Sequence, residues 1–130
     1  MALLADGFWE SLWADWSPGY DPVDDIAELR RHITADTIAG VINPYRASFN
    51  PEFADPGVAD EAAAALSPPP VPTLYLHGAT DGAIGAELLG DVETYLPAAG
   101  SAFRLVDGVG HFLHLEKPEE VAGLIRDWLG

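Results

Sequence analysis

The sequence contains no cysteine among its 130 residues. This absence excludes disulfide bonds, thiolate ligands for a metal ion and a cysteine nucleophile. Basic residues are also scarce, with 6 Lys and Arg against 21 Asp and Glu, which gives a formal net charge of -15. Because binding to nucleic acid or to an anionic lipid surface requires clustered Lys or Arg, we expect neither as a partner.

Long apolar runs are missing as well. No continuous apolar stretch reaches the roughly 18 residues of a membrane-spanning helix, and the start, MALLADGFWE, lacks the basic and apolar regions of a signal peptide. We therefore expect a cytoplasmic location. A chain of this length with 48% hydrophobic residues has enough material for a core, and we expect one compact unit.

The first 50 residues show the periodicity of helices. Apolar side chains separated alternately by one and three positions predict a first helix, with an apolar face formed by Phe8, Trp9, Leu12, Trp13 and Trp16. A second helix is predicted with Asp21 as its N-cap and Pro22 at its first position. A third is predicted from Thr34 until Pro44, since proline disfavours helix at the residue before it. Residues 1–50 are thus predicted to form a helical segment.

The remainder divides at a proline-rich stretch. Residues 51–72 contain six of the 11 prolines, which a continuous helix or a central strand would not tolerate, and form a connection. Residues 73–130 then predict strand, helix, strand and helix: the strands TLYLHG and AFRLVDG, a helix over 86–96 and a last helix from Pro118. This order indicates an α/β fold with two parallel strands and flanking helices.

Two side chains suited to proton transfer follow the predicted strands. Asp81 comes after the first strand and His111 after the second, and loops at the carboxyl ends of neighbouring parallel strands meet. A carboxylate that accepts from one imidazole nitrogen leaves the other nitrogen to take a proton. The alternative is structural, in which Asp81 makes a turn and His111 packs beneath the last helix.

The run VPTLYLHGATDG, followed by a helix, a strand and GVGHFLHLEKPEEVAGLIRDWL, resembles the end of an α/β-hydrolase. The resemblance is closest to the epoxide hydrolase and haloalkane dehalogenase-like group, and covers only the cap region and the C-terminal portion. It implies that Asp81 is the triad acid and His111 the triad histidine. It also implies that residues 1–50 are a helical cap (lid) segment, and that residues 73–130 are the C-terminal βαβα part of the hydrolase core.

Three further residues are predicted to bind substrate. Tyr45, in INPYRASF, matches the tyrosine of the epoxide hydrolase cap motif that donates a hydrogen bond to the epoxide oxygen, although Pro44 replaces the usual aromatic neighbour. Tyr45 could equally be a core aromatic with its hydroxyl in solvent. His77 is expected to line the site or to be satisfied in the core, and Phe112 follows His111 in the same loop. His77, Asp81 and His114 lack the spacing of a helix-borne metal pair, so we expect no metal and no cofactor.

The nucleophile of such an enzyme is missing. No G-x-S-x-G or G-x-D-x-G elbow occurs, and no serine follows a predicted strand in a glycine-flanked turn. We therefore expect a hydrolase for a small apolar epoxide or ester that lacks its nucleophile-bearing N-terminal half and is inactive alone. The alternative is a non-catalytic fragment or interaction module that pairs with another chain, or with itself, through the exposed edge of the first strand.

Overall fold

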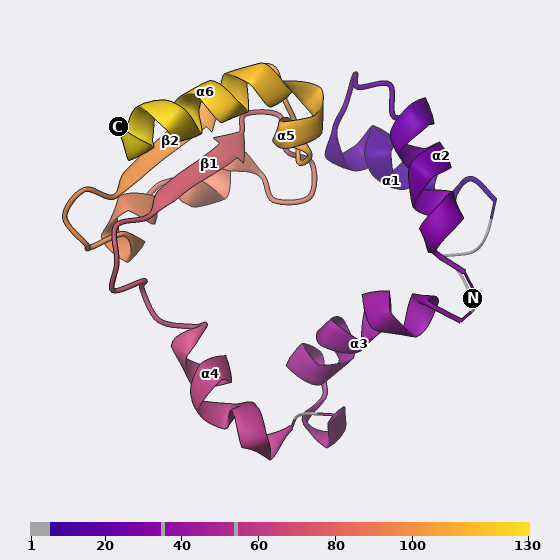
Figure 1. The fold of residues 1–130 in the computed structure, drawn as a ribbon, viewed down its shortest axis with the longest axis horizontal. Helices are drawn as coiled ribbons and strands as arrows, with labels where there is room; N and C mark the ends of the chain where they lie inside the picture. Colours follow the sequence, from indigo (N-terminus) through magenta and orange to yellow (C-terminus); the bar gives the residue numbers. More distant parts are fainter. Residues whose placement is uncertain (1–5, 35, 54) are drawn as a thin grey trace. The chain divides into compact units, whose positions relative to one another are not determined.

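The computed structural model describes residues 6–34, 36–53 and 55–130 (Figure 1). The chain divides into two compact units, one of Met1–Glu10 and Pro22–Ser67 and the other of Ser11–Asp21 and Pro68–Gly130. Each has its own buried apolar side chains: Trp9, Ile26 and Ile38 in the first, and Trp13, Val106, Val109 and Val121 in the second. The expectation of one compact unit is therefore wrong.

The predicted aromatic stripe forms α1 (Phe8–Trp16), whose first turn belongs to the first unit and whose remainder belongs to the second. In the first unit, α2 (Val23–His32) buries Ile26 and places acidic residues in its first turn and basic residues in its last. These charges suit the two ends of the helix dipole. Pro22 lies just before this helix, at the N-cap, and not at its first position as predicted.

The third helix differs from its prediction. α3 (Ile38–Phe49) begins after Thr37 and runs through Pro44. The expected stop at Pro44 is wrong, because proline removes a single N–H from the ladder while later amides keep their acceptors, as the bond from the Asn50 N–H to the Arg46 carbonyl shows. The proline-rich connection is also partly helical, with η2 (Pro51–Phe53), η3 (Pro56–Val58) and α4 (Ala59–Ala64).

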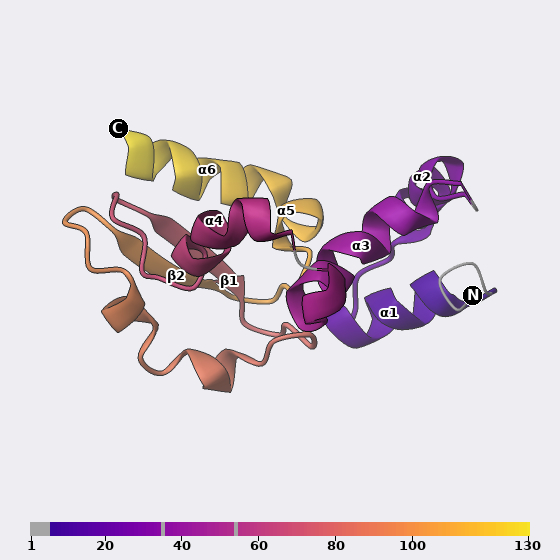
Figure 2. The ribbon, with the colours of Figure 1, turned by 90° about the horizontal axis from the view of Figure 1, so that it is seen from below.

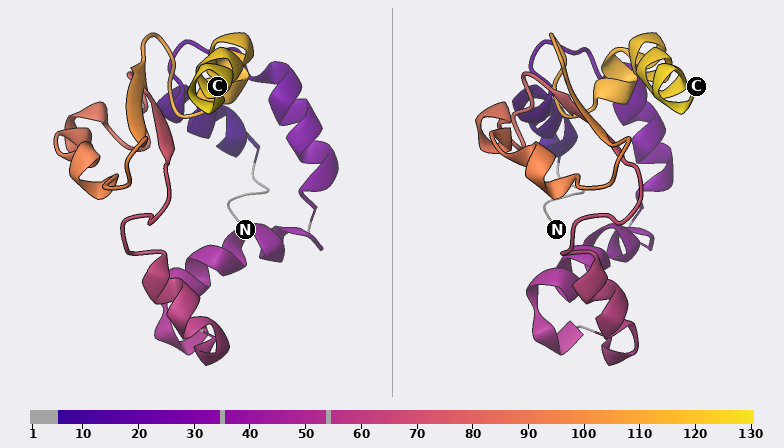
Figure 3. Two further views of the ribbon diagram at one scale, coloured as in Figure 1. Left: turned by 60° about the vertical axis from the view of Figure 1, so that its left-hand side comes forward. Right: turned by 90° about the vertical axis from the view of Figure 1, so that its left-hand side faces the viewer.

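The second unit is built on a two-stranded parallel sheet. β1 (Leu74–Gly78) pairs with β2 (Ala102–Val106), with Leu74 opposite Ala102 and Gly78 opposite Val106. Both strands and their parallel pairing are as predicted. α6 (Pro118–Leu129) covers one face of the sheet, and two 3-10 segments lie on the other (Figures 2 and 3). The unit is therefore a mixed α/β structure with helical elements on both faces of the sheet.

The helix predicted over residues 86–96 is not formed. Instead the chain makes two 3-10 turns, η4 (Ala86–Leu89) and η5 (Val92–Tyr95), with Gly90 and Asp91 between them. Glycine in a helix interior carries a large entropic penalty, and 3-10 structure is suited to short pieces of this kind. The last predicted helix is confirmed as α6, which follows the short α5 (Leu113–Glu116). Of the helices in the described ranges, none is long and apolar enough to cross a membrane.

At Gly78, the last residue of β1, the backbone of the loop after β2 approaches very closely. A Cβ atom on Gly78 would lie 2.0 Å from the Gly110 carbonyl oxygen and 2.6 Å from that of Val109, so backbone would have to move. We expect Gly78→Ala to lower the free energy of unfolding by about 1–3 kcal/mol, as overpacking typically does. Urea unfolding followed by tryptophan fluorescence measures this change.

Gly123 on α6 provides the matched control, because a Cβ atom there meets only Arg126, at 3.9 Å. Gly123→Ala should leave the protein as stable or raise its stability by about 0.5–1 kcal/mol, since alanine is the better helix former. Equal effects of the two substitutions would contradict the close approach at Gly78.

Candidate active site

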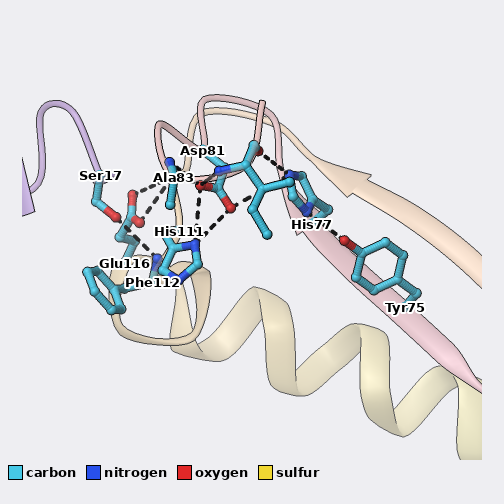
Figure 4. Close-up of polar contacts among 10 residues, drawn as sticks. Ser17, Tyr75, His77, Asp81, Ala83, His111, Phe112 and Glu116 are labelled. Carbon is cyan, nitrogen blue, oxygen red and sulfur yellow. Dashed lines mark hydrogen bonds and ion pairs between the residues drawn. The ribbon is translucent and has the colours of Figure 1, made fainter. Parts of the chain in front are cut away.

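Asp81 is fixed by the turn that follows β1. Its main-chain N–H bonds to the Gly78 carbonyl, and its carboxylate oxygen Oδ1 accepts from the N–H groups of Ala83 at 2.8 Å and Ile84 at 3.0 Å. The side chain is only 5% exposed. The carboxylate therefore closes its own turn and keeps one orientation (Figure 4).

His111 meets this carboxylate from the loop after β2. Its Nδ1 lies 3.0 Å from Oδ2 and 3.2 Å from Oδ1 of Asp81. An ionised carboxylate only accepts hydrogen bonds, so Nδ1 carries the proton and Nε2 of the neutral ring is the basic nitrogen. Among the described residues no hydrogen bond occupies Nε2, and the side chain is 30% exposed. Nε2 is therefore available to take a proton.

The acidity of Asp81 favours this arrangement. Burial raises the pKa of the Asp81 carboxyl, but the hydrogen bonds from Ile84, His111 and Ala83 outweigh burial and hold this pKa below its ordinary value of 3.8. At neutral pH Asp81 is consequently an anion that orients the imidazole of His111 and would stabilise its charged form.

The loop that carries His111 has its own support. The Gly110 N–H donates to both carboxylate oxygens of Glu116, at 2.8 and 3.0 Å. Gly108 adopts φ +66°, a conformation that favours glycine and that turns the chain after β2. The glycine-rich GVGHF sequence and the glutamate of α5 thus shape the loop together.

His77 lies on the far side of Asp81 from His111 (Figure 4). It is 4% exposed, with Nε2 3.0 Å from the Ile84 carbonyl oxygen and 3.6 Å from Oδ2 of Asp81, and Nδ1 2.9 Å from the Tyr75 hydroxyl. A carbonyl only accepts, so Nε2 donates to Ile84 and Nδ1 accepts from Tyr75. Both ring nitrogens therefore have hydrogen-bond partners. Of the two roles expected for His77, lining the site or being satisfied in the core, this arrangement matches the second.

The same polar group affects Tyr75. Burial, followed by the negative charge of Asp81, raises the pKa of the Tyr75 hydroxyl. The hydroxyl therefore keeps its proton at neutral pH and remains the donor to Nδ1 of His77. Tyr75, His77 and the Ile84 carbonyl form a continuous hydrogen-bonded support beneath the Asp81 turn.

Phe112 belongs to an aromatic group beside His111. Its ring stacks on Trp13, with centroids 4.4 Å apart, and makes an edge contact with the His111 ring at 5.1 Å. The Trp16 ring also meets the His111 ring edge-on, at 4.8 Å. His111 therefore lies against apolar rings on one side and the carboxylate of Asp81 on the other.

Of the predicted site residues, the structure brings together Asp81, His111, His77 and Phe112 in the second unit. Tyr45 lies on α3 in the first unit, where its side chain is 63% exposed and is not a core aromatic. His114 is exposed on α5. Over residues 6–34, 36–53 and 55–130, no group of three His, Asp or Glu is placed to hold a metal ion.

Trp16 and Ser17 contact the site and were missed from the sequence. The Trp16 carbonyl accepts from the His111 N–H, and the Ser17 hydroxyl oxygen accepts from the Phe112 N–H at 3.1 Å. Ser17 is fully buried, although it directly follows a helix that the sequence assigns to the helical segment. The only local signal was a small hydroxyl side chain at the end of an aromatic stripe.

Comparisons with family models, with curated proteins and with solved structures find no match to this chain. Asp81 and His111 themselves form an oriented pair of carboxylate and imidazole in which His111 Nε2 is free to accept a proton.

The pKa of Asp81 generates a prediction for acid stability. Because this pKa is lower in the folded chain than in the unfolded one, ionised Asp81 stabilises the fold above about pH 4, and this contribution is lost as the pH falls through the folded-state pKa. The stability difference between the wild type and Asp81→Asn should therefore be constant above about pH 5 and shrink as the pH falls from about 5 to 2 in urea unfolding. Asp127→Asn removes the same charge from an exposed position of α6 and should show no comparable loss.

Proposed function

We propose that this chain is the cap and C-terminal part of an α/β-hydrolase, and that His111 and Asp81 form the proton-transfer pair of a hydrolytic enzyme. The observation that carries the proposal is the 3.0 Å contact between His111 Nδ1 and Asp81 Oδ2 at the carboxyl ends of two parallel strands. The resemblance of the VPTLYLHGATDG and GVGHFLHLEKPEEV runs to the end of this fold supports it.

In the proposed reaction His111 is the general base. For an epoxide, a carboxylate nucleophile attacks a ring carbon, the ring C–O bond breaks, and the alkoxide of the covalent ester that forms takes a proton from solvent. For a carboxylic ester, His111 Nε2 takes the proton of a serine nucleophile and passes it to the alcohol that departs as the covalent ester forms. In both cases Nε2 then takes a proton from the water that hydrolyses the covalent ester. Asp81 holds the imidazole in the correct tautomer and stabilises the imidazolium that forms. The proton on Nε2 is afterwards returned to the departing group, so the pair is regenerated.

The nucleophile would come from another segment of polypeptide. In the described ranges no serine hydroxyl is hydrogen-bonded to His111, and the two that support the second unit, Ser17 and Ser101, are acceptors for main-chain N–H groups. We therefore propose that a separate N-terminal half supplies the nucleophile and the oxyanion donors.

The sheet offers a place for such a half. β1 pairs with β2 along one edge, and in the described part of the chain no strand covers the other edge. Parallel sheets are normally covered and larger than two strands, because an open edge leaves N–H and C=O groups unpaired. We propose that a parallel strand of the nucleophile-bearing half pairs with β1.

The proposed substrate is a small apolar epoxide or ester. The rings of Trp13, Trp16 and Phe112 beside the imidazole favour an apolar group near the reacting bond. We also propose, from the resemblance of INPYRASF to the epoxide hydrolase cap motif, that Tyr45 donates a hydrogen bond to the oxygen of an opening epoxide ring.

A second candidate function rests on the same open strand edge. If β1 pairs with a strand that carries no nucleophile, the chain is an interaction module and the His111 and Asp81 pair is structural. The two functions differ in whether His111 affects turnover once the partner is present.

The test is co-expression of this chain with the polypeptide encoded immediately upstream of it, assayed on p-nitrophenyl acetate and styrene oxide. The chain alone should hydrolyse p-nitrophenyl acetate no faster than an equal concentration of imidazole, whereas the reconstituted complex should turn over both kinds of substrate. His111→Gln should lower kcat by about 10²–10⁴-fold, the usual contribution of a general base.

His114→Gln is the matched control, because His114 is exposed three residues further along the chain, and it should keep activity within about twofold, as surface substitutions usually do. A complex that forms but shows no His111-dependent turnover would contradict the hydrolase and support the interaction module. Turnover by the chain alone that His111→Gln abolishes would contradict the need for a second half.

The role of Tyr45 is tested on the same complex with two substrates. Tyr45→Phe should lower kcat/KM for styrene oxide by about 10–100-fold, the value of a hydrogen bond to developing negative charge, and leave p-nitrophenyl acetate hydrolysis unchanged. Tyr95→Phe, an exposed tyrosine on η5, should change neither. An equal loss on both substrates in Tyr45→Phe would argue against epoxide activation by this hydroxyl.

A further inference from the structure

The carboxyl-terminal end of α1 lies against both loops that carry the proton-transfer pair. The Trp16 carbonyl oxygen accepts from two main-chain N–H groups, that of Gly82 at 3.1 Å and that of His111 at 2.9 Å. Gly82 directly follows Asp81 in its loop. A carbonyl oxygen has two lone pairs, so one peptide group of α1 joins the two loops.

The next residue adds a third bond. The Ser17 hydroxyl oxygen accepts from the Phe112 N–H at 3.1 Å, directly after His111 (Figure 4). The Ser17 side chain is fully buried, so loss of its hydroxyl would leave the Phe112 N–H directed at a buried position with no acceptor, which is costly. Three hydrogen bonds, two to the Trp16 carbonyl and one to the Ser17 hydroxyl, therefore attach the end of α1 to the two loops. The donors are the main-chain N–H groups of Gly82, His111 and Phe112.

These contacts leave no space between the backbones. A Cβ atom on Gly82 would lie 1.8 Å from the Asp15 carbonyl oxygen, and one on Gly110 would lie 2.5 Å from the Ser17 Cα and 2.6 Å from the Trp16 carbonyl oxygen. Glycine is needed at both positions because backbone approaches backbone there. The loops cannot shift toward α1, and the hydrogen bonds oppose a shift away from it.

Aromatic rings extend the same contact to the imidazole. Trp13 is 6% exposed and stacks on Phe112, and the Trp16 ring meets the His111 ring at 4.8 Å with the planes at 68°. An edge-to-face contact of this kind restricts rotation of the imidazole. The orientation of His111 is thus set by Asp81 on one side and by α1 on the other.

We propose that residues 13–17 are a positioning segment that sets the distance between His111 and Asp81. Trp16 and Ser17 are positioning residues, since they act through the two loops and through the ring of His111. This inference deepens the proposed function, because the value of a fixed pair rests on its use as a general base. It assigns to the end of α1 a role that its place in a helical cap segment does not suggest.

The test is an NMR measurement on the whole chain labelled with ¹⁵N-histidine. The chain has only four histidines, so the His111 ring signals are assigned by their loss in His111→Gln. The readout is the rate at which the Nδ1 proton of His111 exchanges with water. Ser17→Ala should raise this rate about tenfold, because one partly buried hydrogen bond that holds the loop is lost.

Ser101→Ala is the matched control. The Ser101 hydroxyl oxygen also accepts a main-chain N–H, that of Thr73 at 3.0 Å, in the same unit but at the opposite end of the strands. This substitution should leave exchange of the His111 Nδ1 proton within twofold of the wild type. An unchanged rate in Ser17→Ala, or an equal increase in Ser101→Ala, would overturn the proposal.

A measurement on the wild type keeps the proposal open to refutation if Ser17→Ala does not fold. The main-chain N–H groups of Gly82, His111 and Phe112 should be protected from exchange and should exchange at a common rate, as members of one cooperative unit do. Exchange of any of the three at the rate of an unstructured peptide would overturn the proposal.

The outcome is separable from that of the hydrolase proposal, since neither readout uses a substrate. An inactive reconstituted complex with a clear effect of Ser17→Ala would reject the hydrolase and keep the positioning segment. An active complex with no effect of Ser17→Ala would do the reverse.

Discussion

The parallel pairing of β1 with β2 is the constraint on which the site depends. Because Gly78 stands opposite Val106, both strands end at the same edge, and the chain leaves them in two adjacent loops. Asp81 follows three residues after one strand end and His111 five residues after the other. Their contact at 3.0 Å is a consequence of this register, since a shift of one strand would separate the loops.

The Asp81 carboxylate then serves two purposes at once. Its Oδ1 closes a turn by accepting from Ala83 and Ile84, and both oxygens face the Nδ1 of His111. In a chain with a net charge of -15, one buried anion is retained because neutral N–H donors and an imidazole surround it. The local dipoles, rather than the overall charge, therefore determine the state of this carboxyl group.

Apolar periodicity and the order of the strands predicted several parts of this structure. The strands, α1, α6 and the approach of Asp81 to His111 follow from apolar periodicity and from the strand order. The predictions of a helix over 86–96 and of a helix end at Pro44 were wrong. How much a single Gly or Pro destabilises a helix depends on its surroundings in the fold. The contact between Ser17 and Phe112 was beyond prediction, since it joins residues 95 positions apart and has no periodic signal.

That long separation has a consequence for biosynthesis. The ribosome completes α1 many residues before it makes Phe112, and the buried acceptor of Ser17 has no donor until then. Closing so large a loop costs chain entropy that only the finished contacts offset. The pair of Asp81 and His111 consequently cannot form until this last part of the chain has been made, and chains that end before His111 would leave the rings of Trp13 and Trp16 without Phe112 and His111 as neighbours.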